Sequence, residues 1–487
     1  MANRTPPPGR GPDGPIGLPG RRIGDRRVRI ARVKPADYRI ATPKRIRKPR
    51  SPAFVLLVGF SLLILVGTVL LALPISSKAG AWTEPLTALF TATSAVCVTG
   101  LVVVDTATYW SPFGQAVILA LVQVGGFGFM TGSTLLLFVL VGRRTGLRDR
   151  VLAQASTDTA NLGSVTTVIR RVAIFSVIVE AAGAVVLTLA FLARGEQPLH
   201  ALISGVFHAI SAFNNAGFDL MGDFRSLTGY ADDAPVLLSI MVLFVLGALG
   251  FAIVGDVAAK RRWTRLALET KVVVLTSTAL LVGGAVLIGA FEWSNPLTLG
   301  ALQPHDRVVN AIFTSATRTA GFNSIPTEHL LEISLLIMIP LMFIGGASGS
   351  TAGGIKVNTF SLLLIAIIST ARGNPSAVAF GRRIPHIVVY RAMAVALLSV
   401  AVVFVVGLGL ELLAGGRLID RAFEAVSALG TVGLSTGLTR ELPDPARLLI
   451  VAAMFAGRLG PLTLVLALTA RARQVSHRPA IETMRIG

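Results

Sequence analysis

Long apolar stretches recur along the chain and alternate with segments that carry most of its charges. A helix needs about 20 apolar residues to cross the hydrocarbon core of a bilayer, and eight stretches reach that length. The sixth of them is interrupted by a run of glycines. The stretches lie at 52–74, 113–141, 166–193, 234–259, 272–291, 330–370, 386–414 and 446–470. This pattern predicts an all-α membrane protein with eight transmembrane helices.

Clusters of Lys and Arg precede the first span and recur after every second one. They lie at 1–50, 143–150, 260–262, 382–383 and 471–478. Loops that are rich in Lys and Arg remain on the cytoplasmic side of a membrane. We therefore expect a multi-pass protein of the plasma (inner) membrane with both termini in the cytoplasm.

The four outer segments, each of which joins the two spans of a pair, share a short motif. It reads Ser-Ala, four variable residues, Gly, and then Leu or Phe. It occurs at Ser94–Leu101, Ser211–Phe218, Ser315–Phe322 and Ser427–Leu434, with the glycines 117, 104 and 112 residues apart. The similar spacing of the motifs, each of which lies between two spans, indicates a fourfold internal repeat of span, outer segment and span.

A second motif, Gly-x-x-Gly, follows each of the first motifs. Its glycines are Gly125/Gly128, Gly247/Gly250, Gly346/Gly349 and Gly457/Gly460. Small residues at this spacing are typical of close helix contacts in membrane bundles. Together the motifs predict a basic disordered tail at 1–50, pore repeats at 51–150, 151–265, 266–375 and 376–475, and a cytoplasmic C-terminus at 476–487.

The stretches before the first motif, at 84–95, 200–212, 306–316 and 418–428, are expected to form short helices. A helix too short to span, followed by glycine, is typical of a re-entrant loop, whose irregular backbone must line a water-filled cavity. Four such loops would direct carbonyls toward one axis, where rings of carbonyls replace the hydration shell of a monovalent cation. Because the side chains differ between repeats, we expect main-chain ligation. The expected ion-binding residues are Val98, Thr99, Gly100, Asn215, Ala216, Gly217, Thr319, Ala320, Gly321, Thr431, Val432 and Gly433.

The interruption of the sixth span is found only in the third repeat. A run of glycines is unfavourable in a helix, at roughly 1 kcal/mol per Gly relative to Ala, so 345–354 is expected to form a loop. Below the filter, such a loop would obstruct the pore and move aside as a gate; the alternative is a kink or a tight helix crossing. The candidate gate residues are Gly345, Gly346, Ser348, Gly349, Ser350, Thr351, Gly353 and Gly354.

Arg458 lies within the last apolar span. An arginine inside a membrane needs a partner or water. Hydrogen bonds to the 345–354 loop, at Ser348, Ser350 or Thr351, would satisfy it and hold the loop closed; the alternative is that it reaches an interface. Lys356 is either a second cationic barrier or a residue that faces the cytoplasmic vestibule. Arg318, beside the third filter loop, is a candidate anchor that holds this loop from behind, although a positive charge next to a cation path is unfavourable.

Composition supports a membrane protein and limits its possible partners. Of the 487 residues 53% are hydrophobic and only 14% are charged, and the net charge is +20. The tail at 1–50 contributes +12 of it, from 15 Lys and Arg against 3 Asp and Glu, so its expected partner is anionic lipid. Nucleic-acid binding is not expected, because no base-stacking aromatics accompany the charge. The single Cys97 excludes a disulfide framework and cysteine-based metal sites.

An enzymatic function has little support in the sequence. No nucleotide-binding motif of the Walker type or dinucleotide fingerprint is present, so ion flux would follow a gradient and nucleotide control would come from another protein. An intramembrane protease or lipid transferase needs paired reactive groups, and the carboxylates Glu180 and Glu411 form no such motif. A receptor or scaffold would not explain four phased loops.

The four filter motifs resemble those of the Trk/Ktr/HKT superfamily of potassium transporters, in particular its KtrB-type subunits. The segments that carry the resemblance are Thr93–Leu101, Phe213–Phe218, Thr317–Phe322 and Gly430–Leu434, and the likeness extends over about 52–487. It implies potassium (K+) uptake by a pseudo-fourfold pore with an intramembrane gating loop and a matching arginine. Glycine at all four positions is similar to the potassium-selective members; a sodium- or ammonium-conducting channel of the same fold is the alternative.

The resemblance also implies partners. It suggests a homodimer on a cytoplasmic ring of nucleotide-binding regulatory subunits (KtrA-like RCK proteins), with sodium (Na+) as a possible activator and no covalent cofactor. The terminal Ile481–Gly487 is similar to the end of the chain that helps to join the two protomers in that family.

Overall fold

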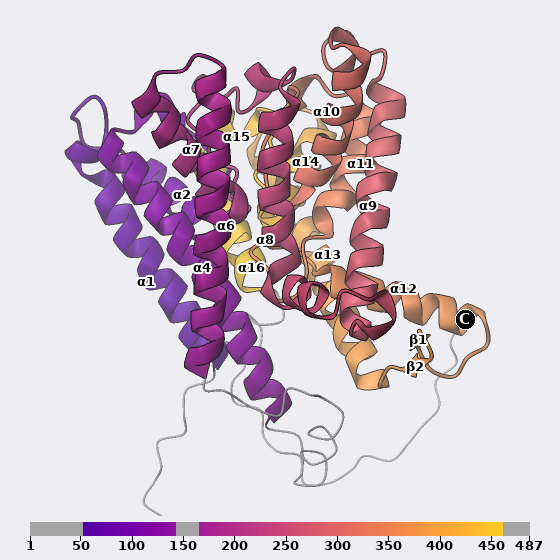
Figure 1. The fold of residues 1–487 in the computed structure, drawn as a ribbon. Coiled ribbons are helices and arrows are strands. Elements are labelled where there is room, and N and C mark those ends of the chain that lie inside the picture. The colour runs from indigo at the N-terminus through magenta and orange to yellow at the C-terminus, as the bar shows by residue number, and fades with distance from the viewer. Residues whose placement is uncertain (1–51, 143–164, 461–487) are drawn as a thin grey trace, which may run out of the picture. The chain divides into compact units, whose positions relative to one another are not determined.

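The computed structural model describes residues 52–142 and 165–460, and this part of the chain is mostly helical (Figure 1). Each of the four predicted repeats contains a long helix, then a short helix that ends inside the protein, and then a further helix that runs back toward the side on which the first began. The helices are α1 (Pro52–Ala72), α2 (Pro85–Val96), α3 (Thr106–Tyr109), α4 (Pro112–Gly142), α6 (Val165–Ala193), α7 (Pro198–Phe213), α8 (Ala234–Lys260), α9 (Leu268–Glu292), α10 (Pro304–Ala316), α11 (Glu332–Phe343), α12 (Val357–Ala371), α13 (His386–Leu413), α14 (Leu418–Gly430), α15 (Leu438–Glu441) and α16 (Asp444–Leu459).

Short elements connect the helices. An antiparallel hairpin of β1 (Val378–Ala379) and β2 (Arg382–Arg383) joins α12 to α13, with Val378 opposite Arg383. The 3₁₀ turns are η1 (Pro74–Ser76), η2 (Thr228–Tyr230), η3 (Trp263–Arg265), η4 (Leu299–Ala301), η5 (Thr317–Thr319) and η6 (Thr327–His329).

The short helices α2, α7, α10 and α14 lie where the sequence predicts them. The first three begin with a proline, which suits the first helical position because its φ is preset and its missing N–H would have no partner there. After α2, α7 and α14 the chain leaves the helix through a residue of positive φ: Val98, Asn215 and Thr431. In each case the motif glycine lies two residues after this residue of positive φ.

Four helices of the described chain are long and apolar enough to cross a membrane: Ile169–Ala193, Ala234–Lys260, Leu268–Glu292 and His386–Leu413. The other predicted spans appear as shorter apolar helices, among them Leu56–Ala72, Pro112–Gly128, Glu332–Phe343 and Val357–Ala371. The predicted all-α membrane fold is confirmed, and the sixth predicted span is divided into α11 and α12 by the 345–354 loop.

Two predicted spans are less regular than the sequence suggested. The fourth, α8, is kinked at Gly250, where φ is 75° and ψ is 160°. In the last span α16 ends at Leu459, because Gly460 has a φ of 81° and precedes Pro461, which disfavours helical backbone before it. Both are second glycines of Gly-x-x-Gly pairs. The predicted segments at 1–50 and 476–487 lie outside the described residues, and the repeat boundaries stay a prediction.

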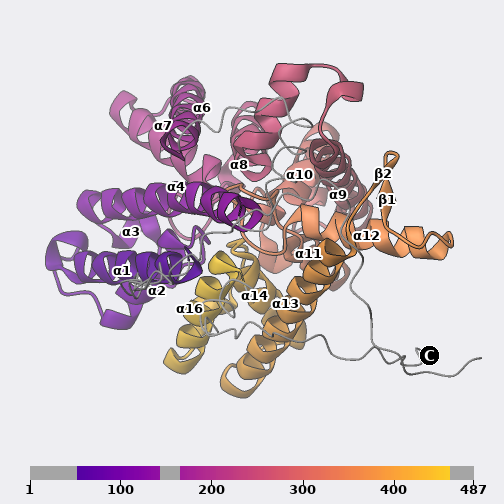
Figure 2. The same ribbon diagram turned by 90° about the horizontal axis from the view of Figure 1, so that it is seen from below.

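The four helical units form a closed ring, which is seen along its axis in Figure 2. The returning helix of each unit packs against the short helix of the next: α4 on α7, α8 on α10, α11 on α14, and α16 on α2. We number the repeats one to four in this order. Because the last contact returns to the first repeat, the ends of the short helices converge on one centre.

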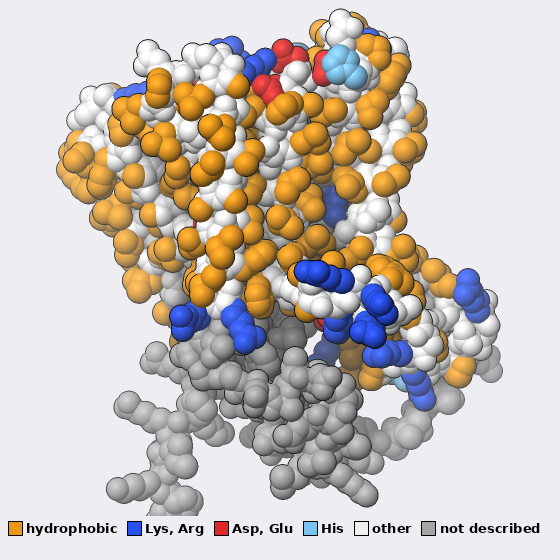
Figure 3. Space-filling model, in the orientation of Figure 1, with side chains coloured by type: hydrophobic (Ala, Val, Ile, Leu, Met, Phe, Trp, Pro, Cys, Tyr) orange, Lys and Arg blue, Asp and Glu red, His pale blue; other side chains and the backbone are white. Residues whose placement is uncertain are grey.

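The outer faces of the helices are apolar and exposed, as expected of a surface in contact with lipid (Figure 3). Leu65 and Val69 of α1 and Leu397 and Phe404 of α13 are more than half exposed. Lys and Arg gather at the lower end in this view, and Asp and Glu are visible at the upper end. We call the upper end, to which the segments after the short helices return, the outer side.

Candidate ion pathway and gate

The four motif glycines lie against one another's loops in a closed cycle. All four have positive φ, between 70° and 98°, which L-residues with side chains rarely adopt. A Cβ on any of them would come closer than 3.0 Å to a carbonyl oxygen of the neighbouring loop. The pairs are Gly100 with Ala216, Gly217 with Ala320, Gly321 with Val432, and Gly433 with Thr99. Only glycine therefore fits, and the loops meet in the order of the repeats.

The serine of the motif anchors the loop that follows it. Ser94 Oγ accepts a hydrogen bond from the Gly100 N–H at 3.0 Å, and Ser427 Oγ accepts one from Gly433 at 3.2 Å. In the second repeat Ser211 Oγ instead donates to the Phe218 carbonyl at 2.7 Å. Since the N–H and C=O of a trans peptide point in opposite directions, the Thr99 carbonyl points away from its own short helix.

The third repeat departs from this arrangement. Ser315 Oγ donates to the Leu281 carbonyl of α9 at 2.8 Å, so it does not hold the loop. Thr317 takes its place and donates to the Phe322 carbonyl at 2.8 Å. The substitution keeps the loop anchored although its helix ends in the 3₁₀ turn η5.

The first glycine of three Gly-x-x-Gly pairs makes room for the end of a short helix. A Cβ at Gly125, Gly247 or Gly457 would come closer than 3.0 Å to the carbonyl oxygen of Val96, Phe213 or Leu429, respectively. Each of these carbonyls lies four residues before a motif glycine. The motif is therefore a close helix contact, as interpreted, and it lets the returning helix approach the filter loop of its own repeat.

The 345–354 loop lies next to the filter loops of repeats two and four. Thr351 donates its N–H to the Gly247 carbonyl at 3.2 Å, and its Oγ1 accepts a hydrogen bond from Asn215 Nδ2 at 2.7 Å. A Cβ at Gly353 would collide with Thr431 Oγ1. The loop is therefore in contact with two of the four proposed ion-binding segments.

The ends of the loop are pinned together by backbone contacts. Gly345 donates its N–H to the Ile355 carbonyl at 2.8 Å, and the Gly346 carbonyl accepts from Val357 at 3.0 Å. Gly349 and Gly354 have positive φ, and Gly349 meets the kink of α8, since its carbonyl lies 3.1 Å from a Cβ built at Gly250. The Ser348 N–H donates to Asn358 Oδ1 at 2.9 Å, and Ser350 is fully buried.

Arg458 is fully buried and joins the loop to the first repeat. Its Nη1 donates to the Thr351 carbonyl, and its Nη2 donates to the Gly125 carbonyl of α4 at 3.2 Å. The contact with Thr351 is one of those that the sequence suggested, whereas Gly125 was not anticipated. Its part in gating stays a prediction.

Two further cations bind backbone carbonyls around the same loop. Arg318 Nη1 donates to the carbonyls of Leu341, at 3.3 Å, and Ile344, at the end of α11. A positive charge stabilises the carboxyl end of a helix, so Arg318 caps α11 and ties the loop of the third repeat to the start of the 345–354 loop. Lys356 Nζ donates to the Ala352 carbonyl. The basic side chains left open by the sequence thus have carbonyl partners.

The sequence did not identify a buried polar network beside the second filter loop. Asn214 Nδ2 donates to Gln123 Oε1 at 2.7 Å and to Glu180 Oε1 at 3.2 Å, and Gln123 Nε2 donates to Glu180 Oε2 at 2.9 Å. Glu180 is therefore not an isolated carboxylate, because it links α4 of repeat one to the filter loop of repeat two. The available signal was the position of Asn214, next to Asn215.

In repeats two and four, the side chain nine residues before the motif glycine binds the segment that follows this glycine. Glu424 in α14 is fully buried and accepts hydrogen bonds from Ser435 Oγ, from the Thr436 N–H at 3.1 Å and from Thr439 Oγ1 at 2.6 Å. At the same position in α7, His208 Nε2 accepts from the Leu220 N–H at 3.4 Å. Both side chains are structural supports of the loops.

We expect Glu424→Ala to lower the thermal midpoint of the purified protein markedly. It leaves three donors without an acceptor, of which Thr439 Oγ1 is buried and the other two are partly buried, and a buried donor left without an acceptor costs about 1–3 kcal/mol. Glu424→Gln keeps one acceptor oxygen and should lower the thermal midpoint less than Glu424→Ala does. Glu441→Gln, on the exposed helix α15, is the matched control, and equal midpoints for all three variants would contradict this role.

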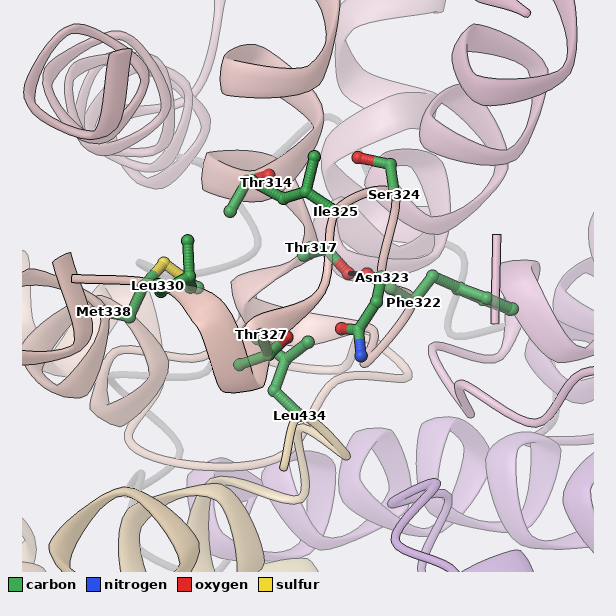
Figure 4. A pocket seen from close by; sticks show the side chains of 10 residues that line it. All are labelled: Thr314, Thr317, Phe322, Asn323, Ser324, Ile325, Thr327, Leu330, Met338 and Leu434. Carbon is green, nitrogen blue, oxygen red and sulfur yellow. Dashed lines mark hydrogen bonds between the residues drawn. The ribbon is translucent and has the colours of Figure 1, made fainter. Parts of the chain in front are cut away.

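A small cavity lies beside the loop of the third repeat, and Figure 4 shows the side chains that line it. Its lining includes Thr314, Asn323 and Ser324, whose side-chain oxygens have no hydrogen-bond partner within the described chain. A buried water needs two to four polar partners, so these groups suit a water molecule that supports the loop.

Comparison with known proteins identifies the family. Residues 49–475 match the TrkH family, described as cation transport proteins. The Ktr system potassium uptake protein B of Bacillus subtilis is 41% identical over 85% of this chain and 92% of its own length. The potassium/sodium uptake protein NtpJ of Enterococcus hirae is 37% identical over 88% of this chain and 96% of its own.

A solved structure supports the fold independently. The crystal structure of the potassium transporter TrkH from Vibrio parahaemolyticus aligns with a TM-score of 0.69 at 21% identity, over 88% of this chain and 86% of the other. Members of the family are transporters rather than enzymes, in agreement with the sequence. With a family match over most of its length and a matching fold, this chain belongs to the TrkH family of cation transport proteins.

Proposed function

We propose that this protein takes up K+ across the plasma membrane through a filter formed by its four loops. The observation that carries the proposal is the closed cycle of motif glycines, each of which packs against a carbonyl of the next loop. The relatives named as potassium uptake proteins support the choice of ion. A sodium- or ammonium-conducting channel of the same fold is the alternative, and the name of the Enterococcus relative, which includes sodium, favours keeping it.

The filter works by exchanging water for carbonyl oxygens. A monovalent cation loses its hydration shell only if the protein offers oxygens in a similar arrangement. The proposed ligands are the backbone groups of Val98–Gly100, Asn215–Gly217, Thr319–Gly321 and Thr431–Gly433. The carboxyl ends of α2, α7, α10 and α14 add partial negative charge near the cation.

The 345–354 loop is proposed to be the gate. Its contacts with Asn215 and Thr431, two of the proposed ion-binding residues, support this assignment, and its glycines would allow the backbone to adopt a second conformation. Arg458 holds the closed form through the Thr351 carbonyl, and opening requires this hydrogen bond to break.

Regulation and assembly follow from the family resemblance. We propose a homodimer on a ring of cytoplasmic nucleotide-binding subunits, with Na+ as activator, both termini in the cytoplasm, and anionic lipid as the partner of the 1–50 tail. The name "Ktr system" of the relatives supports a multi-component transporter. The basic residues at one end of the molecule support the orientation (Figure 3).

Ion uptake in a bacterium that lacks its own potassium transporters tests the function. We expect cells that express this chain to grow at limiting K+ and to accumulate rubidium, a potassium analogue, faster when Na+ is present. Cells with the empty vector are the control. Accumulation of sodium or ammonium without rubidium would favour the alternative.

A further inference from the structure

The order of the repeats determines which outer segments are neighbours. In a ring closed as one, two, three, four and back to one, repeats two and four face each other across the axis. Any direct contact between the outer segments of these two repeats therefore connects opposite sides of the outer mouth. A cation–π pair among the described residues is such a contact.

The contact joins Phe224 of repeat two to Arg440 of repeat four. The Arg440 guanidinium lies over the Phe224 ring, 4.3 Å from its centroid, which is a cation–π distance. Arg440 also lies 3.7 Å from Glu328 of repeat three, and the Phe224 N–H donates to Asp105 of repeat one at 2.8 Å. All four repeats thus meet around one aromatic ring and one guanidinium.

The segment that presents Phe224 has an unusual backbone. Gly222, Asp223, Phe224 and Ser226 all have positive φ, a costly conformation for residues with side chains. Its far end is fixed to repeat three, because Ser226 Oγ accepts from the Asn323 N–H at 3.1 Å and Leu227 donates to the Asn323 carbonyl at 2.8 Å. The surrounding contacts therefore hold Phe224 in place.

The charges at this contact affect the concentration of cations at the outer mouth. Arg440 remains 38% exposed, and its carboxylate partner Glu328 lies at a long distance and is 45% exposed. A positive group at the mouth of a narrow path lowers the local concentration of cations. An arginine is an unexpected residue in front of a cation filter unless it restricts access.

We propose that Phe224 and Arg440 form an outer constriction that limits the access of cations to the filter. Phe224 narrows the mouth, and the Arg440 guanidinium adds an electrostatic barrier that the Glu328 carboxylate and the Asp105 carboxylate beside Phe224 partly offset. Movement of the Gly222–Ser226 segment would open the path. The inference rests on the proposed function for the identity of the ion, but the constriction itself does not depend on that identity.

A cysteine beneath the constriction reports access directly. Asn323 lies two residues after a motif glycine, donates its N–H to Ser226 Oγ of the Gly222–Ser226 segment, and is partly exposed. Asn323→Cys would be labelled from outside with a cationic and a neutral methanethiosulfonate of similar size. The single native cysteine, Cys97, is buried and contributes little background.

In the Asn323→Cys variant, the additional substitution Arg440→Gln is expected to raise the labelling rate of the cationic reagent by about ten-fold or more relative to that of the neutral reagent. Phe224→Ala should raise both rates. Arg225→Gln is the matched control, since Arg225 is an exposed arginine of the segment that carries Phe224 and, within the described part of the chain, forms its ion pair with Asp223. Rates for Arg440→Gln equal to those of the parent would overturn the proposal, whether or not Phe224→Ala folds.

Rubidium uptake distinguishes this inference from the proposed function. Arg440→Gln should lower the KM at low ionic strength, and the difference should shrink at high salt, where charges are screened. A parent protein that carries no rubidium but shows charge-selective labelling would support the constriction and refute potassium uptake. A parent that carries rubidium while Arg440→Gln changes neither labelling nor KM would refute the constriction alone.

Discussion

Replacing Gly100 with serine is expected to abolish growth at limiting potassium and to reduce the preference for rubidium over sodium by at least about ten-fold. Gly100 has a φ of 91°, and a Cβ there would collide with the Ala216 carbonyl of the next loop. The side chain must therefore displace a carbonyl that we propose as a ligand. A change of only 1.4 kcal/mol in relative ion binding already accounts for a ten-fold change in preference.

The control for this substitution is Gly255→Ser. Gly255 lies in α8, and a Cβ there would meet no atom within 4 Å. Both variants should be expressed at the level of the parent, as judged by the amount of purified protein. Growth and ion preference of Gly100→Ser equal to those of Gly255→Ser would refute the assignment of the filter.

Replacing Arg458 with alanine is expected to raise rubidium uptake in cells that lack a regulatory partner, by about ten-fold or more. Arg458 donates hydrogen bonds to the Thr351 carbonyl of the gate loop and to the Gly125 carbonyl of α4. Hydrogen bonds from charged groups contribute about 1.5–3 kcal/mol each. Their loss should shift the balance between closed and open loop toward the open form.

Two further variants define the role of Arg458. Arg458→Lys keeps the charge but cannot reach both carbonyls with a planar fork, so an intermediate rate is expected. Arg447→Gln is the control, because Arg447 lies on the same helix and pairs only with the nearby Asp444 at 3.6 Å. Uptake by well-expressed Arg458→Ala that equals uptake by Arg447→Gln would contradict the bracing role.

The glycine pattern carried most of the information about the pathway. Gly100, Gly217, Gly321 and Gly433 were identified from a repeated motif alone, and all four lie in one cycle of close contacts. A position that requires positive φ and close approach excludes every other residue, so it is visible in a single sequence. The serine at the start of the motif was also informative, because the hydroxyl groups of Ser94 and Ser427 accept hydrogen bonds from the N–H groups of the motif glycines.

Residues that act through distant partners were harder to interpret. Arg318 had two opposing interpretations in the sequence, and its hydrogen bonds to α11 support the anchoring role. The sequence showed only that Glu180 belongs to no paired-carboxylate motif, and it did not identify the two amide side chains, from Gln123 of α4 and from Asn214 after α7, that bind it. The partners of such groups lie in elements far away in the chain, and their identity depends on how helices pack.

The sequence by itself determined the apolar spans, the four short helices, the break at 345–354 and the positions of the motif glycines, because each of these depends on local composition, periodicity or backbone sterics. Only the tertiary structure decided the order of the repeats around the axis, the Gly125 partner of Arg458 and the meeting of Phe224 with Arg440. These contacts join residues that are hundreds of positions apart, and only the packing of whole helices brings their atoms within reach.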